Sequence, residues 1–137
     1  MGGGGSFMYA LHHPELFSSA CPLSGYVGEL SIENFKQRFL NGNKTYSEEK
    51  TQQYYENHNA ISLINKLDSE KIKGVRWYID CGDDDFLFEG NSLVHIAMTK
   101  KGIPHEYRVR DGRHNWTYWR ASLPKVLEFV SDSFHQY

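Results

Sequence analysis

The chain has 137 residues, the size of one domain, and its 39% apolar and 23% charged residues are typical of a globular protein. A net charge of −2 without a basic run argues against nucleic acid or an anionic membrane surface as a partner. No apolar run approaches the ~20 residues that a membrane-spanning helix needs, and no basic region followed by an apolar one marks a signal peptide.

The N-terminal segment predicts a helix and then a short buried strand. Residues 6–13 favour a helix entered from a glycine loop, and Pro14 ends it because the residue before a proline avoids helical backbone. FSSACPLS at 17–24 is small and apolar, as in a buried strand. Cys21 and Cys81 could form at most one disulfide, on which a chain this long and aromatic does not depend, so both are expected to be buried free thiols. Their spacing matches no metal site.

Residues 26–73 are more polar and predict an insertion of helices and loops that lies across the sheet. A first helix is expected to end at Asn41-Gly42, a C-cap signal, and a second to begin at Ser47, an N-cap residue. A third short helix follows. The apolar faces of the first and third helices are Ile32, Phe35, Phe39, Leu40 and Ile61, Leu63, Ile64, Leu67. None of these segments carries a chemical signature.

Two strands and a helix between them come next. VRWYIDCG at 75–82 is a continuous run typical of a strand buried on both faces. An acidic loop at 83–90 and a helix at 91–101, ended by Gly102, lead to a strand at 104–110.

A loop at 111–115 then precedes a final amphipathic helix over 116–134, in which Pro124 either kinks the helix or restarts it. The apolar stripe of this helix is Trp116, Trp119, Leu123, Leu127 and Val130.

Strands that alternate with helices predict an α/β fold: one domain over residues 1–137, with a parallel sheet of three or slightly more strands flanked by helices. A three-stranded parallel sheet leaves two exposed edges, and such an edge can pair with a second copy of the chain. So small a sheet also suggests part of a larger fold, in which ligands bind at the carboxyl ends of the strands.

Chemistry-bearing residues follow the last two strands. Asp83, Asp84 and Asp85 come after one strand and His114 after the next, whereas Asp80 lies inside a strand and is expected to be structural. Because neighbouring parallel strands end at the same edge, a carboxylate and the His114 imidazole can meet there. Such a pair orients the base of a Ser-His-Asp triad.

Three stretches carry a family resemblance. MGGGGSFMYALHHPELF resembles the second half of the nucleophile elbow G-x-S-M-G-G-x-G, and the helix after it, in the putative-esterase family of α/β-hydrolases, which includes esterase D-like and feruloyl esterases. CGDDDFLFEGN resembles the family's acid loop, Cys-Gly-x-x-Asp, and GIPHEYRVRDGRHNWTYWRASLP resembles its histidine loop and closing helix. The resemblance covers nearly the whole chain and is loosest over 26–73.

The resemblance implies a serine carboxylesterase with Asp85 as triad acid, His114 as base and the backbone at Met1 as an oxyanion-hole donor. The family's nucleophilic serine would stand immediately before Met1, so we expect the C-terminal part of an enzyme, inactive by itself. The implied substrates are acyl esters, such as feruloyl or acetyl esters of plant cell-wall polysaccharide, and no metal or cofactor is implied.

Other residues are weaker candidates. Ser6 lacks the glycine that follows an elbow serine, and Ser24 and Trp116 are expected to line a pocket at most. Trp119 is expected in the core. No role is expected for the six other histidines, which are His12, His13, His58, His95, His105 and His135. The alternative to an enzyme part is a non-catalytic relative that folds or associates with another chain. A carbohydrate-binding module is disfavoured by the helical spacing of the tryptophans.

Overall fold

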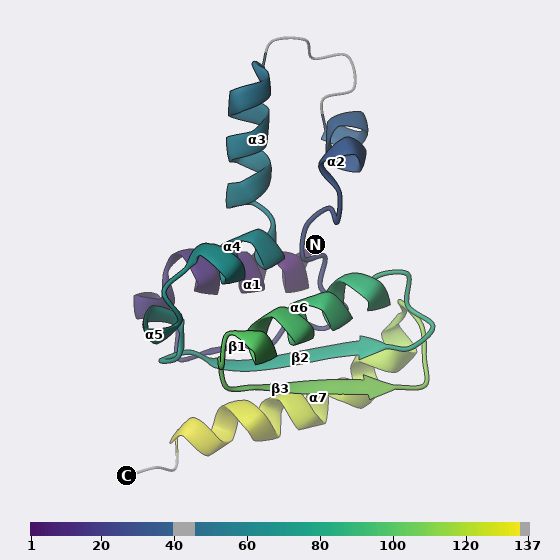
Figure 1. The fold of residues 1–137 in the computed structure, drawn as a ribbon. Coiled ribbons are helices and arrows are strands. Elements are labelled where there is room, and N and C mark those ends of the chain that lie inside the picture. The colour runs from purple at the N-terminus through teal and green to yellow at the C-terminus, as the bar shows by residue number, and fades with distance from the viewer. Residues whose placement is uncertain (40–45, 135–137) are drawn as a thin grey trace.

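A parallel sheet forms the centre of the computed structural model, which describes residues 1–39 and 46–134. The strands are β1 (Ser19–Ala20), β2 (Arg76–Gly82) and β3 (His105–Arg110). β2 lies in the middle and runs parallel to both neighbours (Figure 1). The predicted α/β fold with a three-stranded parallel sheet is confirmed.

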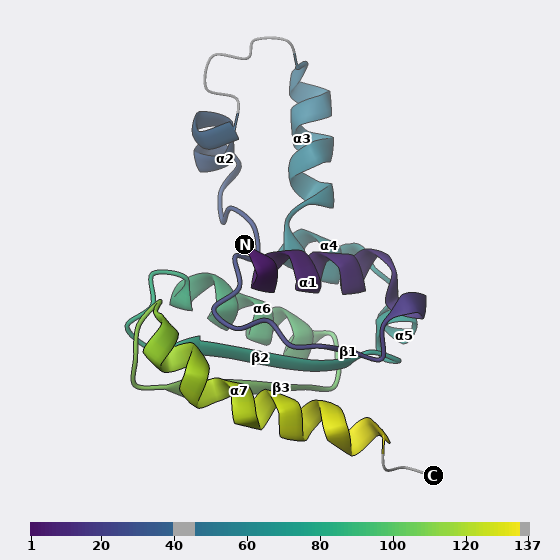
Figure 2. The same ribbon diagram turned by 180° about the vertical axis from the view of Figure 1, so that it is seen from behind.

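Helices cover both faces of this sheet. The helices of the described residues are α1 (Gly2–His12), α2 (Ile32–Phe39), α3 (Glu48–Asn57), α4 (Ala60–Lys66), α5 (Ser69–Ile72), α6 (Phe88–Lys100) and α7 (Trp116–Ser131), with short 3-10 turns at Pro14–Leu16 and Asp132–Phe134. α1 and α6 lie on one face and α7 on the other, as Figures 1 and 2 show from opposite sides. α4 packs against both α1 and α6. None of the helices in the described ranges is long and apolar enough to cross a membrane.

The core lies between β2 and the helices on its first face. β2 is buried from Trp77 to its end, as predicted for a central strand covered on both sides. The Trp77 ring packs edge-on against Phe7 of α1, with 5.0 Å between ring centroids, and its Nε1–H donates to the Ile72 carbonyl at 2.9 Å. The indole is therefore buried with its polar atom satisfied.

Helix α1 begins at Gly2, so the predicted glycine loop before residue 6 is wrong. The glycines serve close packing instead. A Cβ on Gly4 would stand 2.1 Å from the Tyr26 carbonyl oxygen, and one on Gly3 would stand 3.0 Å from the Leu23 carbonyl oxygen. Only glycine lets the first turn of α1 lie this close to the backbone of residues 23–26.

β1 is shorter than the predicted strand at 17–24. Pro22 has no N–H to donate to β2, and pairing resumes as a single bridge between Leu23 and Asp80. Cys21, beside this break, is half-buried, and Cys81 in β2 is buried; both are free thiols.

Helix boundaries in the middle of the chain follow polar caps. The predicted cap at Ser47 is confirmed, because its hydroxyl accepts from the Lys50 N–H at 3.3 Å. The third predicted helix is instead two, α4 and α5, capped by Asn59 and Asp68. Leu40 and the predicted C-cap at 41–42 lie outside the described residues.

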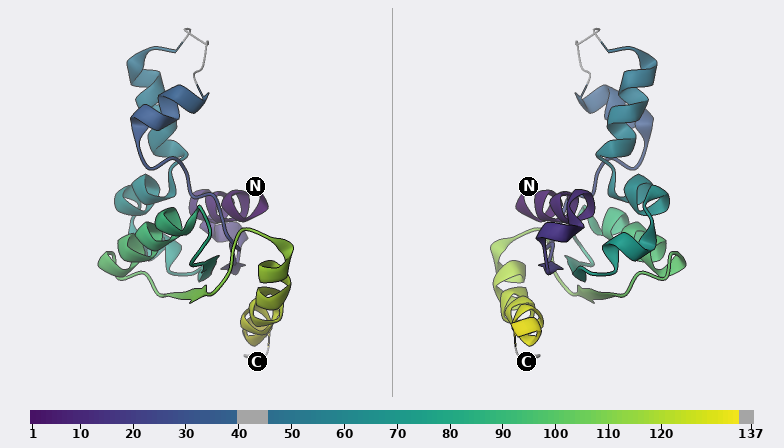
Figure 3. Two further views of the ribbon diagram at one scale, coloured as in Figure 1. Left: turned by 90° about the vertical axis from the view of Figure 1, so that its right-hand side faces the viewer. Right: turned by 90° about the vertical axis from the view of Figure 1, so that its left-hand side faces the viewer.

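α2 and α3 form an arm that projects away from the sheet, whereas an insertion lying across it was expected (Figures 1 and 3). Two hydrogen bonds hold its base. The Asn59 side-chain amide donates to the Glu29 carbonyl at 2.5 Å, and His12 Nε2 lies 2.8 Å from the Asn57 carbonyl oxygen. The two ends of the arm are thereby joined to the cap of α4 and to α1.

Helix α7 turns a different face to the sheet from the predicted one. Its buried residues are Tyr118, Ser122 and Phe129, and the helix continues through Pro124. The predicted stripe is largely exposed, including Trp116, Leu123 and Leu127. The reason is a polar network under α7, described below, which draws Tyr118 and Ser122 inward.

Candidate active site

The loops that follow β2 and β3 bring Asp85 and His114 together. His114 Nδ1 lies 2.9 Å from Asp85 Oδ2 and 3.2 Å from Oδ1. The Asp85 side chain is fully buried, and that of His114 is 31% exposed. A carboxylate can only accept here, so Nδ1 carries the proton and donates it. The imidazole is held in one tautomer and one orientation.

The carboxylate is itself fixed by backbone contacts. Asp85 Oδ1 accepts the Leu87 N–H at 2.9 Å, and the Asp85 N–H donates to the Gly82 carbonyl at 3.2 Å. On the other side, Asn115 caps α7 by accepting the Tyr118 N–H at 3.0 Å. Asp85 and His114 thus lie in tight turns directly before α6 and α7, which limits their movement.

Aromatic rings enclose the His114 imidazole. Phe86 lies 4.8 Å away in a tilted arrangement and Trp119 4.9 Å away edge-on, both measured between ring centroids. Trp119 is half-buried in the site, not in the core where it was expected. Its Nε1–H donates to the Ser24 hydroxyl at 3.1 Å, so the ring packed against His114 is also held to the loop after β1. Ser24 has a left-handed backbone with φ of 46°.

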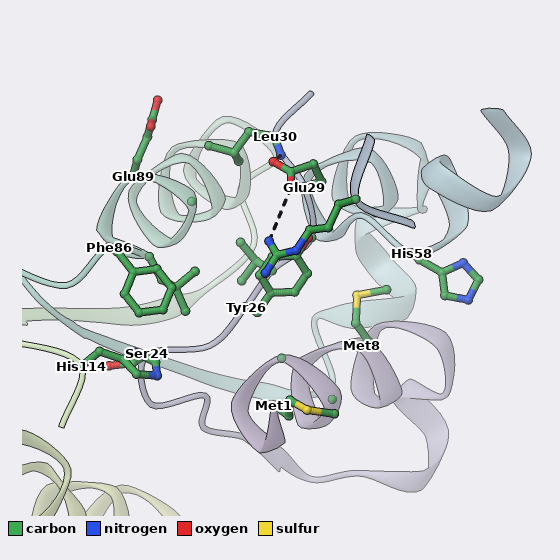
Figure 4. Close-up of a pocket in the computed structure, with 17 residues that line it drawn as sticks. Met1, Met8, Ser24, Tyr26, Glu29, Leu30, His58, Phe86, Glu89 and His114 are labelled. Atoms are coloured by element: carbon green, nitrogen blue, oxygen red, sulfur yellow. Dashed lines mark hydrogen bonds and ion pairs between the residues drawn. The ribbon is translucent and has the colours of Figure 1, made fainter. Parts of the chain in front are cut away.

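A cavity of about 700 Å³ opens beside His114. Figure 4 shows Phe86, Ser24 and His114 on one side of it and Met1 of the α1 segment on another. Ser24 lines the cavity, as expected, whereas Trp116 is not part of its lining. The rest of the lining is Gly4, Gly5, Met8, Tyr26, Val27, Gly28, Glu29, Leu30, Arg38, His58, Leu87, Glu89 and Gly90. Most of these residues lie in segments without a chemical signature in the sequence.

The N-terminus of α1 borders the same cavity through Met1, Gly4 and Gly5. The Met1 carbonyl accepts the Gly5 N–H at 3.0 Å, so the first-turn amides before Gly5 have no partner within the helix. Free amides and the positive end of the helix dipole favour negative charge. The cavity therefore has the His114 imidazole on one side and a helix N-terminus, which favours negative charge, on another.

Within the described part of the chain, His114 Nε2 has no hydrogen-bond partner. Ser6 does not supply one, because it lies inside α1 and its hydroxyl donates to the Gly3 carbonyl at 2.9 Å. The free Nε2 is the position from which a histidine takes a proton in a Ser-His-Asp triad.

Metal-ligating residue types gather beside the site, outside the cavity. Among the described residues, Asp83, Asp84 and Asp111 place carboxylate oxygens within 4.8 Å of one another, and all three are exposed. One Asp83 oxygen accepts the Gly112 N–H, and Asp84 lies 3.6 Å from Arg113. These contacts account for two of the three carboxylates without a metal ion.

A buried polar network under the site is absent from the sequence-based prediction, apart from Asp80 as a structural residue. The Asp80 carboxylate accepts from the Tyr118 hydroxyl at 2.6 Å and the Ser122 hydroxyl at 3.3 Å, and it pairs with Arg110. Burial and the hydrogen bond to Asp80 raise the pKa of Tyr118. Polar residues at helical spacing in α7 are the signal that could have revealed this network.

One protein family and several known proteins are similar to this chain. The family described as "Putative esterase" matches residues 1–130. An acetyl esterase from Caldicellulosiruptor saccharolyticus is 31% identical over 70 residues, which are 51% of this chain and 26% of that protein. The structure of a ferulic acid esterase superposes with a TM-score of 0.75 at 32% identity and covers 95% of this chain. S-formylglutathione hydrolase from Staphylococcus aureus shares the fold, with a TM-score of 0.69 over 94% of this chain at 21% identity.

This chain is short beside its relatives. It spans 47% of the ferulic acid esterase chain and 50% of the S-formylglutathione hydrolase chain. The strands and helices described above therefore correspond to about half of each of those folds.

Proposed function

Because the chain belongs to the Putative esterase family, we propose that it carries the acid and the base of a serine carboxylesterase. One observation supports this above all. A buried carboxylate, Asp85, orients the imidazole of His114, whose second nitrogen is free beside a cavity that an N-terminal helix end also borders. General bases of acyl transfer are held in this way.

In the proposed mechanism His114 Nε2 takes the proton of a serine hydroxyl as its oxygen attacks the ester carbonyl carbon. The resulting oxyanion is stabilised by backbone N–H groups at the start of α1, beginning with the position of Met1. Collapse of this intermediate breaks the ester bond, and the alcohol leaves with the proton from His114. Water, activated by the same imidazole, then releases the acid and frees the serine. Asp85 holds the Nδ1–H throughout.

The attacking serine is proposed to precede Met1 in a longer polypeptide. Met1 lines the same cavity as His114, so a residue placed just before Met1 would lie close to this cavity. By this proposal the 137-residue chain alone does not turn over esters, since loss of a triad serine costs on the order of a million-fold in turnover.

The substrate is proposed to be a feruloyl or acetyl ester of plant cell-wall polysaccharide. The relatives with 31% and 32% identity are an acetyl esterase and a ferulic acid esterase. Phe86 and Tyr26 give the cavity aromatic walls that suit a phenolic acyl group. The proposed chemistry needs no metal or cofactor.

Two experiments test these proposals. The coding DNA before the Met1 codon is expected to encode an in-frame Gly-x-Ser. Purified residues 1–137 should show no saturable hydrolysis of p-nitrophenyl acetate, whereas the longer protein should, and its His114→Ala variant should lose about 10⁴-fold or more in kcat. Saturable turnover by residues 1–137 that His114→Ala abolishes would place the nucleophile inside this chain and contradict the proposal.

A second candidate role is that of a non-catalytic relative that associates with another chain. It is favoured by the exposed apolar side chains of α7, among them Leu123 and Leu127, and by β1, which pairs with β2 along one edge only. A longer protein that has an upstream Gly-x-Ser but no measurable esterase activity would support this role.

A further inference from the structure

Two hydrogen bonds from the loop after β2 hold Gly112 in the loop after β3. The Asp83 carboxylate accepts the Gly112 N–H at 3.0 Å, and the Asp84 N–H donates to the Gly112 carbonyl at 3.0 Å. Gly112 has a left-handed φ of 150°, which favours glycine, and it stands two residues before His114. We call these two hydrogen bonds to Gly112 the clasp, and Asp83 contributes the only side chain in it.

The clasp leaves the loop little room on its buried side. A Cβ on Gly82 would stand 2.2 Å from the Gly112 oxygen, and a Cβ on Gly112 would stand 2.4 Å from the Tyr118 ring. The Tyr118 ring is held in place, because its hydroxyl donates a hydrogen bond to buried Asp80. Movement of the histidine loop is thus open only toward solvent, where the Asp83 carboxylate opposes it.

We propose that Asp83 is a positioning residue for the Asp85–His114 pair and acts by holding the Gly112 amide. This inference rests on the proposed function, in which the pair is the acid and base of an esterase. Without the Asp83 acceptor, the loop can shift outward and lengthen the contact between His114 Nδ1 and Asp85. Small displacements of a catalytic group are costly, since about 1 Å can lose a hundredfold in rate.

The neighbouring charges supply a matched control. Asp84 is also exposed and next in sequence, but its carboxylate faces Arg113, and the Gly112 N–H donates to Asp83 instead. Asp111 lies in the same exposed group, and Arg110 is engaged by Asp80. A purely electrostatic effect on His114 would be shared by Asp83 and Asp84, whereas a hydrogen-bonding effect belongs to Asp83 alone.

The test compares Asp83→Ala, Asp83→Asn and Asp84→Ala in the protein at the length its gene encodes. NMR follows the His114 Nδ1–H proton, assigned by its loss in His114→Gln, and kinetics follow p-nitrophenyl acetate. Asp83→Ala should speed exchange of this proton with water and lower kcat, each about 10-fold, with KM within twofold. Asp83→Asn, whose amide oxygen can still accept, and Asp84→Ala should resemble the parent protein. Asp83 and Asp84 are both exposed, so all three variants should fold.

Two outcomes would overturn the inference. Equal exchange rates of the Nδ1–H proton in Asp83→Ala and Asp84→Ala would show that Asp83 has no special role. If Asp83→Asn changed proton exchange and kcat as much as Asp83→Ala, the effect would be due to charge. A protein without esterase activity, in which the Nδ1–H proton still responds to Asp83→Ala alone, would refute the proposed function and leave the positioning of the pair intact.

Discussion

Asp83, Asp84 and Asp85 are consecutive carboxylates with three different surroundings. Asp85 is buried against His114, Asp83 accepts a backbone amide from the neighbouring loop, and Asp84 faces solvent and Arg113. The chain direction reverses within this turn, so adjacent side chains point to different partners. A cluster of like charges is therefore not one functional unit, and each residue needs its own variant.

The thiol of Cys81 is expected to be unreactive because it is buried. Burial is the main cause that raises the pKa of the Cys81 thiol from 9.0 to about 12. We expect native protein at about pH 8.5 to react with iodoacetamide roughly a hundredfold more slowly at Cys81 than guanidinium-unfolded protein. Peptide mass spectrometry of the alkylated protein measures this ratio.

The same shift has a consequence for stability. The folded pKa lies above the unfolded one, so the protonated thiol stabilises the fold below about pH 9, and this stabilisation is lost as the pH rises toward about 12. Cys81→Ala should weaken the fall in unfolding free energy over this range. Equal labelling rates in native and unfolded protein would show that Cys81 is accessible and contradict the expectation.

Among the elements, α1 is helical despite four consecutive glycines, Gly2 to Gly5. Glycine is a poor helix former, which costs about 1 kcal/mol for each residue relative to alanine. Tertiary packing overrides this propensity, because only residues without a Cβ atom allow α1 to approach residues 23–26. The helix end that borders the cavity is thereby placed by packing.

A pair of adjacent glycines tests this account. Gly4→Ala should destabilise the protein by about 1–3 kcal/mol, because the new Cβ would overlap the Tyr26 carbonyl oxygen. Gly5→Ala has nothing within 4 Å of its new Cβ and should be neutral or stabilising by about 0.5–1 kcal/mol. Urea unfolding followed by circular dichroism measures both. Similar effects of the two substitutions would mean that helix propensity, not packing, dominates.

A histidine pair joins α6 to the start of β3. His95 Nδ1 lies 2.8 Å from His105 Nε2, and the His105 Nδ1 proton is directed at the Ile103 carbonyl. Tyr107 stacks on His95 with 4.6 Å between ring centroids. Burial, and then the neighbouring His105, lower the pKa of His95 below its ordinary 6.5.

This shift predicts an acid-sensitive contact between the two elements. Stability that depends on neutral His95 is present above about pH 6.5 and is lost as the pH falls through the folded pKa. His95→Gln should therefore reduce the loss of unfolding free energy between about pH 7.5 and pH 5.5, measured by urea titration. His13→Gln, at an exposed histidine, is the control, and an unchanged pH dependence in His95→Gln would refute the assignment.

At the scale of the whole molecule, the sheet is covered on both faces, and its two edge strands, β1 and β3, pair only with β2. The face of α7 that points away from the sheet carries exposed apolar side chains, with Leu123 at 47% and Leu127 at 60% exposure, and Phe134 in the turn after α7 is 65% exposed. Exposed apolar surface and edge strands with one unpaired side each favour association. The proposed occupant is a second copy when the chain is present alone.

Purified residues 1–137 should accordingly elute with a mass above the 15.9 kDa of one chain in size-exclusion chromatography with light scattering. Leu127→Glu should shift the mass toward that of the monomer, because a charge cannot be buried in an apolar contact without a large cost. Lys125→Glu on the same helix changes charge outside the apolar side chains and serves as control. A monomeric parent chain would exclude self-association through this surface.

The order of strands and helices was readable from the sequence, because apolar runs and capping residues act over a few neighbours. The esterase family was readable as well, because its loops keep short patterns such as Cys-Gly-x-x-Asp, which selected Asp85 among three aspartates. His114 followed from its place after the last strand. The catalytic roles of Asp85 and His114 stay predictions until the variants are measured.

Only the tertiary structure decided which faces and which distant backbones meet. The inward face of α7 depends on Asp80, which lies 38 residues before Tyr118, and the glycines of α1 depend on the backbone at Tyr26. The arm of α2 and α3 and the Asp83–Gly112 clasp depend in the same way on contacts remote in sequence. Local patterns report hydrophobic periodicity and turns, whereas burial, close approach and polar pairing arise only when separate segments pack together.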